Sequence, residues 1–450
     1  MAKTIQYNLT EGSILGAIRR LALPMVASMI LNDVLQLVNL FFVSRLGSEF
    51  VAGMTMGQVF MQLFFMVAMG ISTGTVAMVA RYVGAGKKAE AQNVVYQSVT
   101  VGLFFAIIMT LLGLFLAEWA MGLLGTKGSV KEYGAIYLQI IAVGGVFIFA
   151  PFCLNSALRG AGDAVTPMKV MMLTNVLNII LAPLLIFGYI GFPRLEIAGA
   201  AWASVISRGA GMVYILRVFL GGKGYFHLRL REFRVDFPVM WALLKIGVFG
   251  SLQMLFRNIS AIFIARIVAV FGVTAMASYG IVMRIINSVL MPSMAFGNAS
   301  ATLVGQNLGA GQPERAARTV WICVGIYATF MLVLSVMFNP LADDIVRFFN
   351  KDPEVIVEGT RFLKVFSATF FFLAFSSIIG RALTGAGDTV SPMIMTGLAL
   401  ILFRLPLCYV LSKQLGMIGI WIGMASSNVI QGLIFPFWFR KGRWQGVRID

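Results

Sequence analysis

The sequence predicts an all-α polytopic membrane protein, with about twelve transmembrane helices in two six-helix lobes around a central cavity. Three observations lead to this fold class. Hydrophobic residues make up 59% of the 450 residues and charged residues only 12%, whereas a soluble domain carries about 25% charged residues. About twelve apolar stretches are long enough to cross a bilayer. The second half of the chain also repeats the first half at an offset of 225 residues, as when the motif that starts at residue 156 recurs from residue 381.

The apolar stretches are expected to be helical, because a backbone in lipid has to satisfy its own hydrogen bonds. A transmembrane β-barrel would instead show alternating segments of about ten residues, and this chain does not. The predicted spans centre near residues 21–43, 51–80, 94–117, 134–157, 168–190, 198–220, 239–269, 273–303, 319–341, 362–383, 391–412 and 415–438.

The repeat is carried by motifs. Residues 156–168 read SALRGAGDAVTPM and residues 381–393 read RALTGAGDTVSPM. Each half has six spans, an even number, so both halves begin on the same side of the membrane. The repeat is therefore parallel, as in transporters whose halves rock against each other. We therefore expect an N-terminal lobe at 1–220, a basic cytoplasmic linker at 221–238 and a C-terminal lobe at 239–450.

The basic residues orient the helices. The net charge is +17, which in a soluble protein can indicate nucleic-acid binding. Here most of the 35 Lys and Arg residues, Arg208 and those of the linker included, are assigned to one side of the predicted spans. That asymmetry predicts that both termini are cytoplasmic. The expected partners are therefore a small-molecule substrate and the lipid bilayer, with no nucleic acid, for a monomer in the cell membrane.

Asp33 is the only acidic residue predicted at membrane depth. A carboxylate near the middle of a span costs about 2.5–3.5 kcal/mol on insertion scales, so we expect Asp33 to face a cavity and bind a proton or a cation. The alternative is a carboxyl group that only hydrogen-bonds to neighbouring helices. Asn32, Gln36 and Asn39 continue the same polar stripe along the helix.

The second half is basic instead. The position equivalent to Asp33 is Asn258, and Arg257, Arg266, Arg284 and Arg404 lie in or near its spans. Arg266 and Arg404 are expected to extend to an interface or to bond helix-end carbonyls. Arg284 is expected to act in a gate or in packing. The residues predicted to line a substrate cavity are Asn32, Gln36, Asn39, Gln58, Gln62, Gln253, Arg257, Asn258 and Arg284.

The ordered motifs resemble the multidrug and toxin extrusion (MATE) family, a branch of the multidrug/oligosaccharidyl-lipid/polysaccharide exporter group. The resemblance runs from about residue 14 to residue 440. The motifs that carry it are Leu-Pro at 23–24, Gly-Ala-Gly at 84–86, RGAGD at 159–163, GAAWAS at 199–204, YGI at 279–281, Arg-Ile at 284–285 and VGQNLGAG at 304–311.

The resemblance implies a cation-coupled antiporter in which an acid on the first helix works with polar residues of the fifth and sixth helices. Those residues would be Asp33, Asn178, Asn175 and Ser204, with Na⁺ held at Asp33 and Asn178 or H⁺ at Asp33. Many relatives carry a second acid where this chain has Ala182, followed by Pro183. One carboxylate fewer favours H⁺ over Na⁺ as the coupling ion.

The predicted function is export of amphipathic, cationic organic compounds by alternating access. The alternative is a flippase or exporter of a lipid-linked or anionic substrate on the same fold, and a third possibility is a receptor that only binds. No Walker motif occurs, so an ion gradient rather than ATP is expected to drive transport. Enzyme chemistry is not expected, because the only histidine lies in the linker and no acids pair within the spans. No cofactor is expected.

Overall fold

In the computed structural model, residues 9–222 and 224–447 are described, and every regular element among them is helical. The chain divides into two compact units, which we call the first and the second lobe. The first lobe holds Arg19–Val248, and the second holds Gly12–Ile18 with the chain from Phe249 onward. Each lobe is described by itself.

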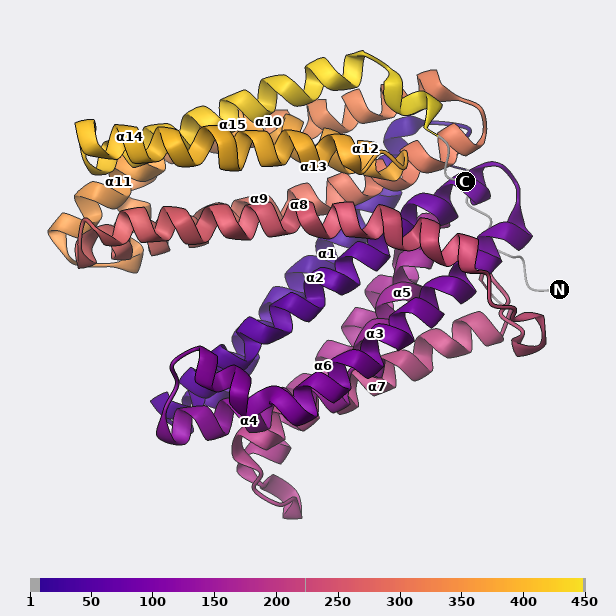
Figure 1. Ribbon diagram of the computed structural model, residues 1–450, viewed down its shortest axis with the longest axis horizontal. Helices are drawn as coiled ribbons and strands as arrows, with labels where there is room; N and C mark the ends of the chain where they lie inside the picture. Colours follow the sequence, from indigo (N-terminus) through magenta and orange to yellow (C-terminus); the bar gives the residue numbers. More distant parts are fainter. Residues whose placement is uncertain (1–8, 223, 448–450) are drawn as a thin grey trace. The chain divides into compact units, whose positions relative to one another are not determined.

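The first lobe contains seven α-helices, two of which form one bent span. Its elements are α1 (Ile14–Ser44), α2 (Ser48–Gly84), α3 (Lys88–Leu123), α4 (Gly128–Val143), α5 (Val146–Gly160), α6 (Val165–Phe187), the short helix η1 (Tyr189–Gly191) and α7 (Glu196–Leu220). α4 and α5 meet at an angle of 52°. α6 lies along α7, while α2 packs against α3, α4 and α5 (Figure 1).

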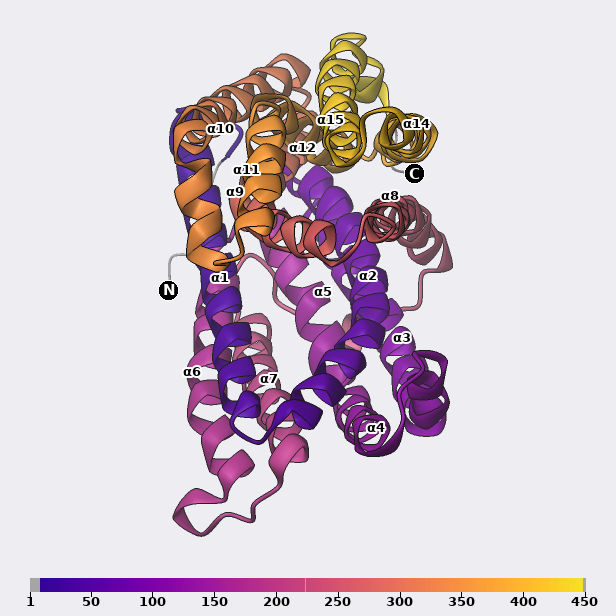
Figure 2. The same cartoon turned by 90° about the vertical axis from the view of Figure 1, so that its left-hand side faces the viewer.

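The second lobe repeats this order with one difference. Its elements are α8 (Phe237–Ala269, of which Phe237–Val248 belongs to the first lobe), α9 (Val273–Gly309), α10 (Pro313–Phe349), α11 (Pro353–Ser367), α12 (Phe370–Gly385), α13 (Val390–Gly397), η3 (Leu398–Arg404), α14 (Leu405–Leu415), α15 (Met417–Arg440) and η4 (Arg443–Gly446). α11 and α12 meet at 55°. α13, the π-helical η3 and α14 form one span, and α15 lies between α12 and α14 (Figure 2).

The number of spans agrees with the sequence. Ten helices of the described chain are long and apolar enough to cross a membrane, and each of the two bent pairs can supply one more span. The predicted all-helical membrane fold with two six-span halves is therefore confirmed. The two bends were not predicted, although they fall at equivalent places in the repeat, after Val143 and after Ser367.

Packing repeats along with sequence. α6 contacts α7 as α14 contacts α15, and α2 contacts α5 as α9 contacts α12. The turns repeat as well. Gly86 and Gly311 have φ angles of 72° and 71°, and Gly162 and Gly387 both have φ of 93°. Only glycine adopts these left-handed conformations at low cost, which explains why the GAG and GAGD motifs recur.

The aspartates of the GAGD motifs begin the next helix. The Asp163 carboxylate accepts hydrogen bonds from the backbone N–H groups of Val165 and Thr166, at 3.0 and 2.9 Å. The Asp388 carboxylate accepts one from Ser391 N–H at 3.0 Å. These bonds satisfy donors that a helix N-terminus leaves free, so the aspartate that occurs in both halves has a structural role.

One predicted charge position is wrong. Arg208 was assigned to a cytoplasmic segment, but it lies at the middle of α7, twelve residues from Glu196 and twelve from Leu220. Its side chain is exposed on the helix. Hydropathy tolerates a single arginine inside an apolar stretch, so the sequence did not place this one correctly.

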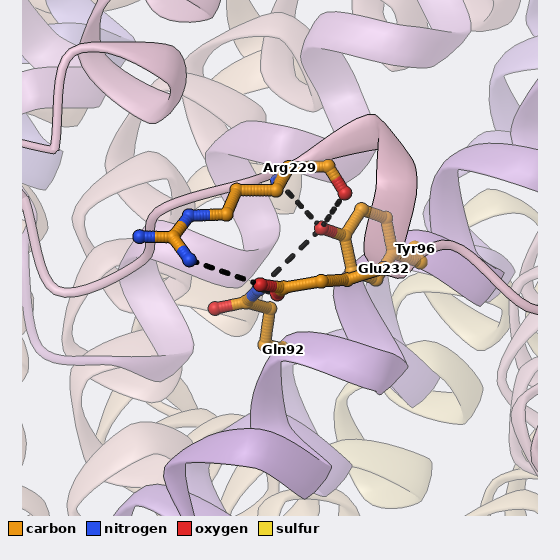
Figure 3. Close-up of polar contacts among 4 residues, drawn as sticks. All are labelled: Gln92, Tyr96, Arg229 and Glu232. Carbon is orange, nitrogen blue, oxygen red and sulfur yellow. Dashed lines mark hydrogen bonds and ion pairs between the residues drawn. The ribbon is translucent and has the colours of Figure 1, made fainter.

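The linker docks on α3 (Figure 3). The Tyr96 hydroxyl donates to the Arg229 carbonyl at 2.8 Å and accepts from the Arg229 N–H at 2.7 Å. Glu232, at the end of η2 (Leu230–Glu232), accepts from the Gln92 amide at 3.2 Å and pairs with the Arg229 guanidinium at 3.3 Å. The segment joining the two halves is thus held to the first lobe by specific bonds.

Two further contacts complete this docking. The Asp236 carboxylate accepts from the Asn93 amide at 2.7 Å and from the Val239 N–H at 3.2 Å, so it ties α3 to the first turn of α8. Phe226 stacks on Phe219 of α7 with ring centroids 5.9 Å apart. Burial raises the pKa of the neighbouring Tyr225 phenol.

Candidate functional site

Asp33 lies in the central part of α1 with a half-buried side chain. Within residues 9–222 and 224–447 its carboxylate has no hydrogen bond and no ion pair. The alternative of a carboxyl group that bonds neighbouring helices therefore has no bond to support it in this structure. Of the other stripe residues, Asn32 and Asn39 are half-buried and Gln36 is exposed.

Two asparagines on α6 face the interior of the first lobe. Asn175 is 3% exposed and Asn178 is 1% exposed. The Asn175 amide donates to the Leu31 carbonyl of α1 at 2.7 Å. The Asn178 amide donates to the hydroxyls of Ser204 and Ser207 on α7, at 3.3 and 3.4 Å. α6 is thereby connected to α1 two residues before Asp33 and to α7 at the predicted serine.

The side-chain oxygens of both asparagines lack partners. The Oδ1 atoms of Asn175 and Asn178 are buried and accept no hydrogen bond from the described residues. A buried acceptor without a donor costs free energy, and it is also what a hard cation or a protonated group can use. The Oδ1 atom of Asn39 on α1 is in the same state. The structure thus places unpaired oxygens on the two helices that the sequence singled out.

These residues fit a proton or a weakly held cation better than a multivalent metal site. No group of three or more His, Cys, Asp or Glu side chains suited to a metal ion occurs in the described ranges. Ala182 is fully buried within an apolar cluster that includes Leu185 and Ile186. Position 182, where many relatives carry the second acid, therefore holds an apolar residue in apolar surroundings.

Ser207 is a residue that the sequence analysis missed. It is 1% exposed and shares the Asn178 amide with Ser204. A signal was present, because Ser204 and Ser207 are three residues apart and hence lie on one face of α7.

The predicted cavity residues are dispersed. On α2, Gln58 and Gln62 are exposed. On α8, Gln253 donates to Thr396 Oγ1 at 2.9 Å and to the Pro392 carbonyl at 3.3 Å. The remaining three are Arg257 and Arg284, both exposed, and Asn258, half-buried. Their contact with a substrate stays a prediction.

Arg404 does not behave as predicted. It was expected to extend to an interface or to bond helix-end carbonyls, but its guanidinium donates to Ser427 Oγ at 2.6 Å and to Asn428 Oδ1 at 2.7 Å, both on α15. Sequence spacing does not reveal this contact, because the residues lie on different helices. Arg266, by contrast, is exposed and three residues from the end of α8.

Comparison with known proteins agrees with the repeat. The family model described as MatE matches residues 24–184 and again residues 250–410. A protein of Thermotoga maritima named "Probable multidrug resistance protein NorM" is 28% identical over 434 residues, which cover 95% of this chain and 92% of that protein. A protein of Shewanella oneidensis named "FAD transporter" is 26% identical over 405 residues, which cover 88% of each chain.

The fold is also found among solved structures. A MATE protein crystallised in the bent conformation superposes with a TM-score of 0.91 over 97% of each chain, at 23% sequence identity. At that identity the likeness concerns the fold.

Proposed function

The chain belongs to the MATE family of membrane transporters, and on that premise we propose that it is a secondary antiporter that exports amphipathic organic compounds in exchange for H⁺ or Na⁺. The observation that carries this proposal is the unpaired Asp33 carboxylate in the middle of α1, on a helix bonded to α6 where two amide oxygens lack donors. The Thermotoga maritima relative, named as a multidrug resistance protein, supports the class of cargo.

Asp33 would carry the coupled charge. When it binds a cation its net charge becomes zero, and moving one charge through the membrane field is worth about 2.3 kcal/mol per 100 mV. Neighbouring residues of α6 and α7 would hold the groups around Asp33 in place for cation binding. Ser204 and Ser207 hold the Asn178 amide so that Oδ1 stays free, and the Asn175 amide fixes α1 against α6.

H⁺ is the coupling ion that we favour. A hard cation needs several oxygen ligands. Asp33 is the only acid predicted at this depth, and the position where many relatives carry a second acid holds Ala182, which is buried in an apolar cluster. A proton needs only the carboxylate itself. Na⁺ coupling would require the Asn175 and Asn178 oxygens to complete the ligand set.

We propose that the cargo is amphipathic. Asp33 favours a cationic group on the cargo, whereas the arginines of the second half favour the alternative, an anionic group. Alternating access between the two repeated lobes would move it. The protein would reside as a monomer in the cell membrane with both termini in the cytoplasm.

The test is transport by purified protein in proteoliposomes with an imposed pH or Na⁺ gradient. Asp33→Asn keeps the shape of the side chain but cannot change charge, so gradient-driven export should fall to background. Glu90→Gln is the matched control, because it removes one exposed carboxylate at the start of α3 and should retain export. Full export by Asp33→Asn under both gradients would place the coupling elsewhere.

A further inference from the structure

Three arginines on different helices of the second lobe are not used by the proposed ion coupling. Arg257 lies on α8, Arg381 on α12, and Arg404 at the end of η3. Gln253 bonds to Thr396 of α13 at 2.9 Å and Ser260 bonds to the Leu400 carbonyl of η3 at 3.5 Å. Arg257 shares a face of α8 with those two residues, so it lies against the span that contains Arg404, and it also interacts electrostatically with Arg381. Like charges on neighbouring helices repel, and a cationic side chain inside a membrane span is costly by itself. The cluster therefore calls for a compensating group.

No such group is present in the described ranges of the chain. None of the three arginines takes part in the ion pairs made by Arg194, Arg229, Arg347 and Arg361. Arg257 and Arg381 make no hydrogen bond with the residues that the structure describes. A guanidinium has five N–H donors, and Arg404 uses only its Nε and one Nη2 donor. Most donors of the cluster are therefore free.

Arg404 is held in place by its bonds to α15. Asn428, which accepts from Arg404, donates in turn to Thr369 Oγ1 at 3.1 Å. Thr369 lies at the 55° break between α11 and α12. η3, which ends at Arg404, is π-helical, and π-helical turns inside α-helices occur often at functional sites. Two irregular backbone segments thus converge on one arginine.

The fold does not require this cluster. At the repeat offset of 225, the first-lobe positions equivalent to the three arginines are Asn32, Ser156 and Ile179, which are uncharged. The span that contains Ile179 is the uninterrupted helix α6. The same six-span scaffold is therefore built in the first lobe without the arginines and without a π-helical turn.

We propose that Arg257, Arg381 and Arg404 form an anion-binding site in the second lobe that takes the phosphate or carboxylate head group of an amphipathic substrate. Planar guanidinium groups bind such head groups through paired N–H donors, and more strongly than neutral donors do. The inference rests on the proposed transport function and narrows its cargo towards compounds with an anionic group. A lipid head group and a soluble amphipathic anion share this chemistry.

The first test uses isothermal titration calorimetry to measure ligand binding to the purified full-length protein in neutral maltoside detergent. Decyl phosphate and decyltrimethylammonium have the same alkyl chain and opposite charge. Decyl phosphate should bind at least about tenfold more tightly, and inorganic phosphate should bind weakly because it lacks the chain. Equal affinity for the two decyl compounds would overturn the proposal and leave water as the only partner of the cluster.

Variants then locate the site. Arg257→Gln and Arg404→Gln should each weaken decyl phosphate binding about tenfold, and Arg404→Lys should give an intermediate loss because it keeps the charge but not the paired donors. Arg208→Gln, at the middle of α7 in the first lobe, is the matched control and should change nothing. If Arg404→Gln does not fold, Arg257→Gln carries the test, since Arg257 holds no bond that the lobe needs. Unchanged binding in Arg257→Gln contradicts the site.

Asp33→Asn separates this inference from the proposed function. That variant should lose gradient-driven export yet bind decyl phosphate as the unaltered protein does. Repeating the titration in phosphatidylcholine nanodiscs with and without phosphatidic acid identifies the source of the anion. Competition by phosphatidic acid indicates a lipid head group, and its absence indicates a soluble amphipathic anion.

Discussion

The two lobes share a backbone and carry opposite charge. In the first lobe Asp33 lies on α1, and unpaired amide oxygens lie on α6, which is bonded to α1 at Leu31. In the second lobe Asn258 replaces the acid and three arginines appear at positions that are uncharged in the first lobe. Turn glycines, helix-capping aspartates and helix contacts are the same in both. The repeat therefore preserves the turns, helix caps and helix contacts that build the fold. The charged residues of the candidate sites lie at positions where the two halves differ in sequence.

The backbone differs at the same place as the charge. The fifth span of the first lobe is the continuous helix α6, whereas its equivalent is interrupted by the π-helical η3, which ends on Arg404. A π-helical turn changes the direction in which the following side chains project. A local change of helix type can thus give two copies of one scaffold different sites.

The largest effect is expected from moving the acid between lobes. The double variant Asp33→Asn with Asn258→Asp keeps one carboxylate at membrane depth but places it in the second lobe, next to Arg257 in the sequence and on the lobe that lacks Asn175 and Asn178. Gradient-driven export in proteoliposomes should remain at background. Restored export would show that either lobe can serve for coupling and would remove the functional difference between them.

Equivalent glycines at the end of α5 and of α12 should respond unequally. A Cβ atom at Gly385 would lie 2.2 Å from the Ala301 carbonyl oxygen, whereas at Gly160 the nearest atoms are side-chain carbons of Val79 at 3.0 Å. Backbone yields less than a side chain, so Gly385→Ala should cost about 3 kcal/mol and Gly160→Ala about 1 kcal/mol. Thermal unfolding in detergent measures the difference, and equal losses would contradict it.

The capping aspartates should show a smaller difference in the opposite direction. Asp163 accepts from two backbone N–H groups and from the Thr166 hydroxyl, while Asp388 accepts from one N–H group. We expect Asp163→Ala to lower the free energy of unfolding by about 2 kcal/mol and Asp388→Ala by about 1 kcal/mol. The corresponding Asn variants, which can still accept, serve as controls in the same unfolding measurement.

The smallest effect concerns the linker, which is bonded to the first lobe. Tyr96→Phe removes both hydrogen bonds to the Arg229 backbone while the aromatic ring remains. The linker should open more readily, by about 1 kcal/mol, and trypsin should cleave it faster after Arg229 or Arg231. Tyr133→Phe on α4 is the matched control, because the Tyr133 hydroxyl makes no hydrogen bond with the described residues. Cleavage of Tyr96→Phe at an unchanged rate would show that the two bonds do not hold the linker.

The sequence by itself determined the membrane class, the span count, the repeat, the family and the position of Asp33. These properties depend on the length of apolar stretches, on the cost of a charge in lipid and on motif order, all of which are local to the chain. The same reasoning misplaced Arg208, because one arginine barely changes the hydropathy of a long span.

Only the tertiary structure decided which polar groups meet. The bonds of Asn178 to Ser207 and of Arg404 to Asn428 join different helices, and the rotation of each helix about its axis sets them. The bends after Val143 and Ser367 and the π-helical turn before Arg404 also have no distinct signal in composition. For each helix, several rotations and several backbone irregularities have nearly equal local free energy. Packing against all the neighbouring helices selects one of them.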